Sequence, residues 1–278
     1  MEPINVMVNG LPGNMAIGIA RHVLADERFS LIPQSLTGPE IDDTEIPVAG
    51  LGVTLIRPDS RQGALERIKS DFGQLITVDF THPSAVKDNA AFYCEQQLPF
   101  VMGTTGGDRD KLIQMVSEAG LSAVIAPNMG KQIVGFQAMM DYAATNFPGL
   151  FEGYRLQIKE SHQAGKADTS GTAKAMLGYF NDLGASHAGD PIAMERDPAV
   201  QKSDWQIPEE YLTGHAWHTY SLDSDDGTVH FSFTHNVNGR EIYMKGTLDA
   251  IAFLSSKIAQ GEPGRIYTMI DILKAGKI

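Results

Sequence analysis

The 278-residue sequence has only one cysteine, no excess of basic residues and no long apolar run. The single cysteine, Cys94, cannot form a disulfide within the chain, and we interpret it as a small buried hydrophobic residue. The formal net charge of -12 and the pI near 5.0 disfavour a nucleic-acid partner or a membrane partner, because binding to either usually requires a basic face. No apolar stretch approaches the roughly 20 residues that cross a bilayer.

The sequence is long enough for two compact domains, and its 42% hydrophobic content can fill their cores. Nothing before Ile4 resembles a signal or transit peptide, since the first predicted strand begins almost at once. We therefore expect a cytoplasmic protein, or one of the plastid stroma if a transit peptide has been removed.

Short apolar runs alternate with helical segments through the first half of the sequence. The runs are apolar on both faces, which is typical of a parallel sheet covered by helices. This rhythm predicts a Rossmann-like, doubly wound parallel sheet. The predicted strands span residues 4–10, 30–36, 75–81, 99–105 and 121–128, and the helices between them span 14–25, 64–72, 84–96 and 110–120.

The pattern changes after residue 127. A long helix over 131–147 precedes a strand over 154–162, a further helix and a poorly patterned stretch over 185–210. The turn signals DSDDG and NVNG separate three further runs, HAWHTYSLD, TVHFSFTHNV and REIYMKG, which predicts antiparallel hairpins. We predict an α+β domain with a largely antiparallel sheet, followed by helices over 247–260 and 264–275.

The turn between the first strand and the first helix is VNGLPGNM, which contains Gly10 and Gly13. Glycines at this position let the backbone turn tightly and approach a pyrophosphate, whose charge the helix N-terminus favours. The full dinucleotide fingerprint GxGxxG is absent, because Leu11 occupies the place of the second glycine. The turn fits a nucleotide site, and the alternative is a turn that needs glycine for geometry only.

Two other strand ends point to the same edge of the predicted sheet. DFTHP (79–83) and GTTGG (103–107) offer hydroxyls and glycines that suit a ribose or a carboxamide, although each alone is typical of an ordinary turn. The end of the second strand, SLTGPE, bears on cofactor choice because an acid there would repel a 2′-phosphate. The sequence has Ser35 and Thr37 at this end and no acid before Glu40, which favours NADPH, although no arginine is evident to bind the phosphate.

One stretch, ESHQAGKADTSGTAKA (160–175), combines an imidazole, an ammonium group and a helix start. His162 ends a predicted strand and can exchange a proton near neutral pH. Thr169 or Ser170 can cap the following helix, which is the structural explanation of the hydroxyls. The same helix N-terminus, with Lys166 nearby, would also bind a carboxylate. A histidine at a strand end is usually structural, but this combination favours catalysis.

Other candidate sites are weaker. His215 and His218 form an H-x-x-H pair, and His230 and His235 lie on a neighbouring predicted strand, so metal binding is conceivable. Residues three apart on a strand point to opposite faces, however, which disfavours His215 and His218 as joint ligands. No cysteine supports them, so zinc is disfavoured and we predict no metal. The aspartates of DSDDG indicate a hairpin turn, with calcium a remote alternative. Met139 and Met140 are predicted to belong to a hydrophobic core.

The motif over 160–175 resembles the signature of the 4-hydroxy-tetrahydrodipicolinate reductases, also called dihydrodipicolinate reductases, enzymes of diaminopimelate and lysine synthesis. The common bacterial form is approximately E-x-H-H-x-x-K-x-D-x-P-S-G-T-A. Here Gln163 replaces the second histidine and the proline before Ser170 is absent, as in the plant-type branch. The resemblance extends from the glycine turn to the C-terminal helix through PNMGKQIVGF, GHAWH, HNVNGREIY and RIYTMIDIL.

The resemblance implies NAD(P)H-dependent reduction of 4-hydroxy-tetrahydrodipicolinate to tetrahydrodipicolinate, with NADPH preferred and NADH also used. His162 would be the general acid and Lys166 its partner, while Gln163 leaves the role of the second histidine open. The substrate, a small cyclic dicarboxylate, would be bound by Gln163, Lys166, Ser170, Gly171, Thr172 and Arg240. The cofactor would contact Gly10, Gly13, Asn14, Met15, Phe80, Thr81, Gly103, Thr104, Thr105, Pro127, Asn128 and Met129, in addition to Ser35 and Thr37.

The resemblance and the change of pattern at Pro127 predict two domains. Residues 1–127 and the C-terminal helices of 247–278 would form a dinucleotide-binding domain, and residues 128–246 a substrate-binding and oligomerisation domain of a homo-oligomer, dimer or tetramer. Two alternatives remain. Another two-domain NAD(P)-dependent oxidoreductase, such as a semialdehyde or amino-acid dehydrogenase, would need a different catalytic set. A non-enzymatic redox sensor would give no reason for His162 and Lys166 near a carboxylate pocket.

Overall fold

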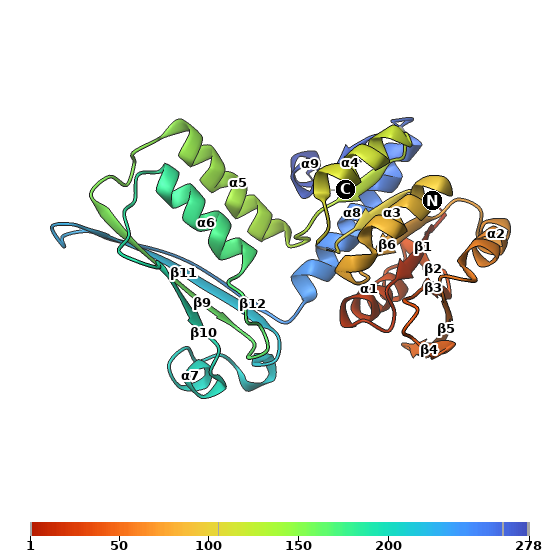
Figure 1. The fold of residues 1–278 in the computed structure, drawn as a ribbon, viewed down its shortest axis with the longest axis horizontal. Helices are drawn as coiled ribbons and strands as arrows, with labels where there is room; N and C mark the ends of the chain where they lie inside the picture. The colour runs from red at the N-terminus through yellow and green to blue at the C-terminus, as the bar shows by residue number, and fades with distance from the viewer. Residues whose placement is uncertain (1, 105, 263, 277–278) are drawn as a thin grey trace. The chain divides into compact units, whose positions relative to one another are not determined.

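The structure, a computed structural model, describes residues 2–104, 106–262 and 264–276. Its internal contacts divide the chain into two compact units. Unit 1 comprises Met1–Val134 and Ile242–Ile278, and unit 2 comprises Gly135–Glu241. The chain leaves unit 1 within helix α5 (Lys131–Asn146) and returns to it at the start of helix α8 (Glu241–Ala259) (Figure 1).

Unit 1 contains a six-stranded parallel sheet. Its strands are β1 (Ile4–Asn9), β2 (Phe29–Leu31), β6 (Ile76–Asp79), β7 (Phe100–Met102), β8 (Ala123–Ile125) and β13 (Ile266–Tyr267). They are arranged in the order β13-β8-β7-β6-β1-β2, so the chain builds first to one side of β1 and then to the other. The carboxyl ends of β1 and β6 therefore flank the switch point where ligands of doubly wound sheets bind.

Helices cover both faces of this sheet. They are α1 (Asn14–Ala25), α2 (Arg61–Phe72), α3 (Val86–Glu95), α4 (Arg109–Glu118), α8 and α9 (Met269–Ala275), with a short 3₁₀ turn η1 (Pro83–Ala85). Val6 and Val8 pack with α1, α8 and α9 in one core, whereas Met7 packs with α2, α3 and α4 in the other, because successive strand residues point to opposite faces. The predicted doubly wound fold is confirmed.

A three-stranded sheet forms a second part of unit 1. Its order is β3 (Gln34–Leu36), β5 (Leu51–Ile56) and β4 (Glu45–Val48). The single strand predicted over 30–36 is divided into β2 and β3, because Pro33 lacks an N–H group for the sheet.

The hairpin of β4 and β5 is not predicted by the sequence pattern. Its two-residue turn, Ala49 and Gly50, has positive φ at both positions, as the turn that matches strand twist requires. Strand β5 then runs parallel to β3, with Leu36 opposite Ile56. The residues that follow β3 and β5 therefore lie at the same edge.

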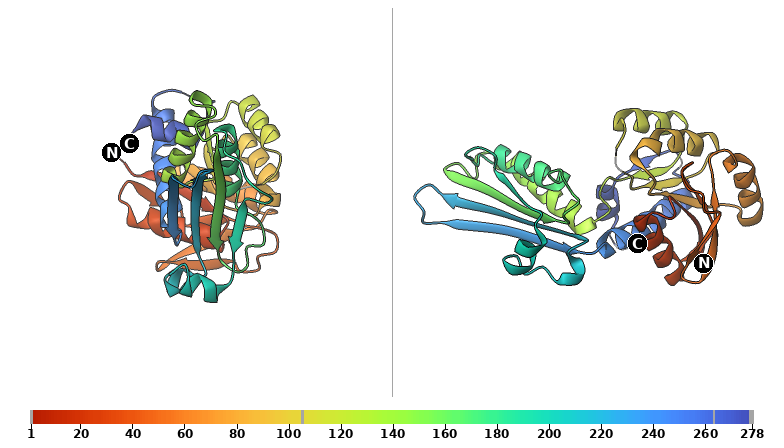
Figure 2. Two further views of the ribbon diagram at one scale, coloured as in Figure 1. Left: turned by 90° about the vertical axis from the view of Figure 1, so that its left-hand side faces the viewer. Right: turned by 60° about the horizontal axis from the view of Figure 1, so that its bottom comes forward.

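Unit 2 contains a four-stranded sheet that is largely antiparallel, as predicted. Its strands are β10 (Ile192–Glu195), β9 (Tyr154–His162), β11 (His215–Ser224) and β12 (His230–Asn238), in that order, with only β10 and β9 parallel. Helices α5 and α6 (Gly171–Asp182) lie on one side of it (Figure 2). Leu156, Ile158 and Tyr220 from the sheet share one core with Met176 and Phe180 of α6.

Three details of the second half of the chain differ from the predictions. The helix predicted over 264–275 begins only at Met269, because residues 266–267 form β13, which pairs with β8. REIYMKG lies at the start of α8 and not in a strand, since Met244, Leu248 and Ile251 are buried at helical spacing. The NVNG turn therefore leads into a helix. Met139, predicted to be in a core, is 64% exposed, whereas Met140 is buried. The poorly patterned stretch contains β10, a short helix α7 (Pro198–Ser203) and a 3₁₀ turn η2 (Glu209–Tyr211).

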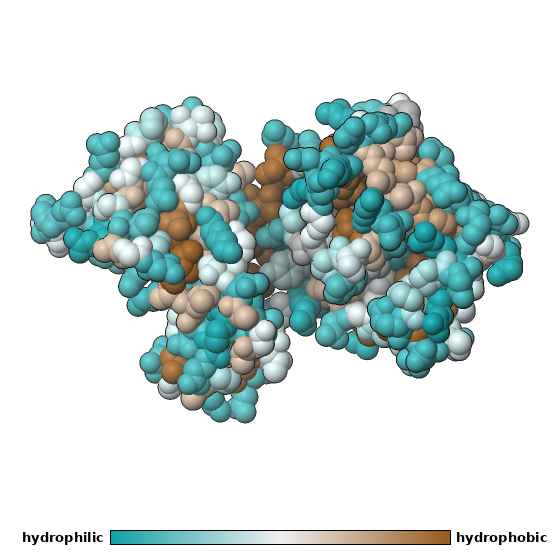
Figure 3. Space-filling model, in the orientation of Figure 1, coloured by the Kyte–Doolittle hydropathy of each residue, from teal (hydrophilic) through white to brown (hydrophobic). Residues whose placement is uncertain are grey.

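The surface seen in Figure 3 is mostly hydrophilic, with hydrophobic side chains in small separate patches. Tyr142, Phe147 and Leu150, near the end of α5, are among the exposed apolar residues. In the described part of the chain, none of the helices combines the length and the apolar character that crossing a bilayer requires.

Candidate active site

The glycine turn lies at the carboxyl end of β1, beside the end of β6. Gly10 has a φ of +102°, and a Cβ at this residue would overlap the carbonyl oxygen of Phe80. The Gly13 N–H donates to the Gly10 carbonyl at 2.8 Å, and α1 begins at Asn14. The first N–H groups of α1 have no acceptor within the helix, so this turn has the features of a pyrophosphate site.

Asp79, the last residue of β6, organises the neighbouring strand ends. Its buried carboxylate accepts hydrogen bonds from the hydroxyls of Thr81 at 2.8 Å, Thr104 at 2.6 Å and Tyr93 at 2.7 Å. Burial and the adjacent carboxylate raise the pKa of Tyr93 well above its usual value, so Tyr93 remains a donor. Thr81 and Thr104, two predicted cofactor contacts, are thereby held together.

Six predicted cofactor residues line one hollow of about 260 Å³ in unit 1. The Phe80 ring packs against Gly103, where a Cβ would overlap it. The Asn128 side-chain oxygen accepts the Gly130 N–H at 2.8 Å, which orients the amide. Tyr243 of α8 completes the lining and was missed, because its segment resembles a strand. The lining residues are Met15, Phe80, Gly103, Pro127, Asn128, Met129 and Tyr243.

Ser35 and Thr37 are buried and support the glycine turn. The Thr37 hydroxyl donates to the Leu11 carbonyl at 2.7 Å, and the Leu11 N–H donates to the Ser35 hydroxyl oxygen at 3.4 Å. Both hydroxyls are therefore engaged by the backbone of the turn.

The carboxyl edge of the sheet in unit 1 fits a dinucleotide. Gly10 and Gly103 each lie where a Cβ would collide with Phe80, so the absence of a side chain at both positions lets this edge pack closely. Asn14, the first residue of α1, follows the glycine turn and is exposed. Thr105, also predicted to contact the cofactor, lies outside the described residues.

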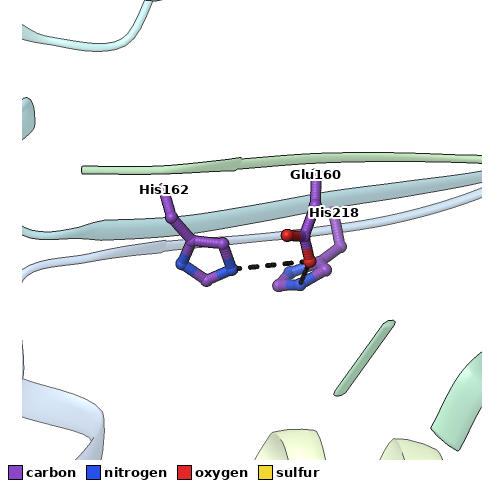
Figure 4. Close-up of side chains that lie close together, drawn as sticks. All are labelled: Glu160, His162 and His218. Atoms are coloured by element: carbon purple, nitrogen blue, oxygen red, sulfur yellow. Dashed lines mark ion pairs between the residues drawn. The ribbon is translucent and has the colours of Figure 1, made fainter. Parts of the chain in front are cut away.

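The predicted catalytic histidine belongs to a row of polar side chains on the sheet of unit 2. Glu160 and His162 are two residues apart on β9 and therefore point to the same face. The strand register places His218 opposite Glu160, and His235 opposite His218. The rings of His218 and His235 stack with centroids 4.7 Å apart. Figure 4 shows the imidazoles of His162 and His218 directed at the Glu160 carboxylate.

Glu160 is fully buried and has several partners. The Arg196 guanidinium donates to one carboxylate oxygen at 2.5 Å, and the Ser170 N–H donates to the other at 3.1 Å. The Nε2 atoms of His218 and His162 are 3.5 Å and 3.8 Å from that second oxygen. Burial alone would raise the pKa of Glu160, but hydrogen bonds from His218, Ser170 and Arg196 outweigh it and lower the pKa far below its usual value. Glu160 is therefore an anion.

His162 is 7% exposed, and its Nε2 has no hydrogen-bond partner among the described residues. Burial, followed by the electrostatic effects of His218, Arg196 and Lys166, lowers the pKa of His162 to about 4, while Glu160 opposes the shift. In this environment the imidazole is neutral at pH 7. Its Nε2 is buried and lies 3.8 Å from the Glu160 carboxylate.

Ser170 is the N-cap of α6, one of the two predicted caps. Its hydroxyl accepts the Ala173 N–H at 3.0 Å and lies 2.9 Å from His218 Nε2. Because Glu160 accepts the Ser170 N–H, the N–H groups of Gly171 and Thr172 are those that remain for an anion at this helix start.

The loop between β9 and α6 brings Gln163 and Lys166 to the same region. The Lys166 N–H donates to the Gln163 carbonyl at 3.0 Å, and the Lys166 carbonyl accepts the Arg196 Nε–H at 2.8 Å. Arg196 therefore joins this loop to Glu160. Arg240 follows β12 and is exposed; among the described residues, no hydrogen bond or ion pair links it to the loop.

Glu160, His162 and His218 could together ligate a metal ion, since one ligand atom from each lies within 4.8 Å of the others. Two histidines and a glutamate are a known zinc set. The carboxylate, however, already accepts hydrogen bonds from a guanidinium and from the Ser170 N–H. A divalent cation would have to lie close to the Arg196 charge. The group is better described as an ion-pair cluster, and the absence of a metal stays a prediction.

Glu160 and Arg196 were missed by sequence reasoning. The signal for Glu160 was available, because the E-x-H spacing on a strand puts both side chains on one face. Arg196 has no comparable signal, since the unpredicted β10 brings it to Glu160 from a distant position.

Two family models match the chain: dihydrodipicolinate reductase, N-terminus, over residues 4–129, and dihydrodipicolinate reductase, C-terminus, over residues 133–273. The chain is 46% identical over 276 residues to 4-hydroxy-tetrahydrodipicolinate reductase 1, chloroplastic, of Arabidopsis thaliana. This alignment covers 99% of the chain and 79% of the relative. It is 42% identical over 273 residues to probable 4-hydroxy-tetrahydrodipicolinate reductase 2, chloroplastic, of Oryza sativa subsp. japonica, with 98% and 84% covered.

Among solved structures, the fold is similar to that of dipicolinate-bound dihydrodipicolinate reductase from Paenisporosarcina sp. TG-14. The TM-score is 0.66 at 19% sequence identity, and the alignment covers 96% of this chain and 97% of that one.

Proposed function

The chain belongs to the dihydrodipicolinate reductase family, and we propose on that basis that unit 1 binds the cofactor and unit 2 the substrate. It is an NAD(P)H-dependent oxidoreductase that reduces 4-hydroxy-tetrahydrodipicolinate in diaminopimelate and lysine biosynthesis. This replaces the alternatives of another dehydrogenase and of a redox sensor. The observation that carries the residue assignment is the unpaired ring nitrogen of His162 beside the buried Glu160 carboxylate.

Bound NAD(P)H supplies the hydride of the reaction. Gly10 and Gly13 would admit its pyrophosphate at the start of α1, where the helix N-terminus favours negative charge. Thr81 and Thr104, held by Asp79, would contact the ribose and carboxamide end, and the hollow that includes Asn128 would hold the nicotinamide.

His162 supplies the proton that, with the hydride, balances the loss of the substrate's 4-hydroxyl group as water. A pKa of about 4 leaves it neutral in the free protein at pH 7, and nearby negative charge raises that pKa. A dicarboxylate substrate adds negative charge, as Glu160 already does. The imidazole therefore gains its proton when substrate binds, and Glu160 stabilises the imidazolium until the proton is given to the substrate.

The substrate carboxylates are bound by separate groups. One carboxylate is held by the N–H groups of Gly171 and Thr172, by the Ser170 hydroxyl and by the Lys166 ammonium. Arg240 pairs with the other. Gln163 donates a hydrogen bond in the place of the second histidine of the bacterial motif, without titrating.

The assay that tests this function follows NAD(P)H oxidation with 4-hydroxy-tetrahydrodipicolinate as the substrate. We expect turnover that depends on both reactants. Protein that binds the nucleotide but does not oxidise it with this substrate would contradict the assigned reaction.

We propose that NADPH is preferred over NADH and that both are used. The support is that Ser35 in β3 and Thr37 directly after it are uncharged, and that the first acid beyond them is Glu40. The expected result is a higher kcat/KM for NADPH when the two cofactors are compared at saturating substrate. A clear preference for NADH would make this assignment wrong.

We further infer a homo-oligomer, dimer or tetramer, through the sheet of unit 2. In the described residues, α5 and α6 cover only one side of that sheet (Figure 2). The proposed compartment is the cytoplasm, or the plastid stroma that the chloroplastic names of the plant relatives suggest.

A further inference from the structure

Two opposite charges lie at the edge where β3 ends. The Thr37 N–H donates to the Ile56 carbonyl at 3.0 Å, so the residue that follows β3 is joined to the end of β5. Arg57 is the next residue of the chain after β5 and is therefore a neighbour of Thr37. The sequence reveals no arginine here, because the hairpin that brings it is not apparent in the pattern.

The Arg57 guanidinium is held over the loop that follows β3. One of its terminal N–H groups donates to the Pro39 carbonyl at 2.7 Å, and the other is 3.4 Å from an Asp42 carboxylate oxygen. The Arg57 side chain is 46% exposed and that of Asp42 is 97% exposed. An exposed pair at this distance is weak, so a phosphate can displace Asp42 while the Pro39 contact keeps the guanidinium in place.

Glu40 returns to the same strand end. The Ile41 N–H donates to the Gly38 carbonyl at 3.3 Å, which closes a turn over residues 38–41. The turn brings the Glu40 carboxylate against Gly38, where a Cβ would overlap both carboxylate oxygens. Glu40 comes three residues after Thr37 in the sequence, but this turn places its carboxylate directly beside Gly38, the residue that follows Thr37.

In doubly wound folds the adenosine ribose lies at this edge, where an acid accepts hydrogen bonds from a free 2′-hydroxyl and an arginine binds a 2′-phosphate. Ser35 and Thr37 are already engaged by Leu11, so their hydroxyls are not the charged determinants. We propose that Arg57 and Glu40 together set the choice of cofactor: Arg57 binds the 2′-phosphate of NADPH, and Glu40 repels that phosphate and binds the free 2′-hydroxyl of NADH. This inference rests on the cofactor site proposed for unit 1, and it accounts for the use of both nucleotides.

The test is a titration of the whole protein with NADPH and with NADH, without substrate, so that it does not depend on His162. Arg57→Gln should weaken NADPH binding by roughly 10- to 100-fold, as expected for the loss of a charge-assisted contact, and leave NADH binding nearly unchanged. Glu40→Gln should strengthen NADPH binding and weaken NADH binding, each by roughly 2- to 10-fold.

Arg61→Gln is the matched control. It removes the same charge four residues further on, from a guanidinium held 4.2 Å from the Phe92 ring centroid, and should leave the ratio of the two affinities unchanged. An equal loss of both nucleotides in Arg57→Gln, or an unchanged ratio, would overturn the inference. Failure of the unaltered protein to bind either nucleotide would overturn the cofactor site itself, and this inference with it.

Discussion

Replacement of His162 by alanine is expected to lower kcat by roughly 10²–10⁴-fold, the usual contribution of a positioned proton donor. The side chain has an unpaired Nε2 and a buried anion 3.8 Å away, so it can carry a proton to substrate and return to neutrality. NADPH binding should be retained, because the proposed cofactor residues belong to unit 1. Steady-state kinetics and nucleotide titration of the variant measure both effects.

Two variants serve as controls for this result. His235→Ala removes a histidine that burial also gives a pKa of about 4, on the same sheet, and should keep kcat close to that of the unaltered protein. Arg240→Ala should raise KM mainly, because it removes a carboxylate partner and not a proton donor. If folded His162→Ala protein kept near-normal kcat, His162 would be a structural histidine and the stretch 160–175 a binding loop only.

Replacement of Arg196 by methionine is expected to lower the free energy of unfolding of unit 2 by about 3–5 kcal/mol, the usual cost of leaving one charge of a buried pair without its partner. The Glu160 side chain has no exposed surface, and the Arg196 side chain is 18% exposed. Both tryptophans, Trp205 and Trp217, lie in unit 2, so their fluorescence during denaturant unfolding reports on this unit.

The pH dependence of the free energy of unfolding is a second measurement of the Arg196–Glu160 ion pair. The lowered pKa of Glu160 means that its contribution is present above the usual glutamate value and is lost only as pH falls through the much lower folded value. In Arg196→Met that folded pKa rises, so acid destabilisation begins at higher pH. Arg196→Met with Glu160→Leu should be more stable than Arg196→Met alone, since no buried charge remains. A loss below about 1 kcal/mol in the single variant would be typical of a surface pair and would contradict this account.

The fold class could be predicted because both units follow simple periodicities. Strands that are apolar on both faces indicated the parallel sheet, and the strand over 154–162 was predicted with its observed bounds. The β4–β5 hairpin could not be recognised from turn chemistry, since Pro47 interrupts one strand and Ala49 adopts a positive φ that alanine seldom has. REIYMKG contains a short apolar run, Ile242 to Met244, that is too short to distinguish a strand from a helix, and only its continuation through Leu248 reveals the helical period.

The candidate site was predictable where its residues are close in sequence. The family resemblance and the motif that contains His162, Lys166 and Ser170 identified the reductase family and its reaction, which the comparisons confirm. Contacts between distant segments were not predictable. Arg196 reaches Glu160 through β10, and Arg57 reaches the end of β3 through a hairpin, so neither partner has a signal in its own neighbourhood.

The most direct test of the central claim, that His162 donates the proton, is the pH dependence of kcat/KM and kcat in the unaltered protein and in His162→Gln. In the free protein the pKa of His162 is about 4, so kcat/KM should decline as pH rises above that value and the protonated fraction falls. In kcat, which reports on the substrate complex, the decline should begin at higher pH, because the substrate carboxylates raise the pKa of His162. Both declines should be absent in His162→Gln. The same decline in kcat, retained in folded His162→Gln protein, would contradict the claim.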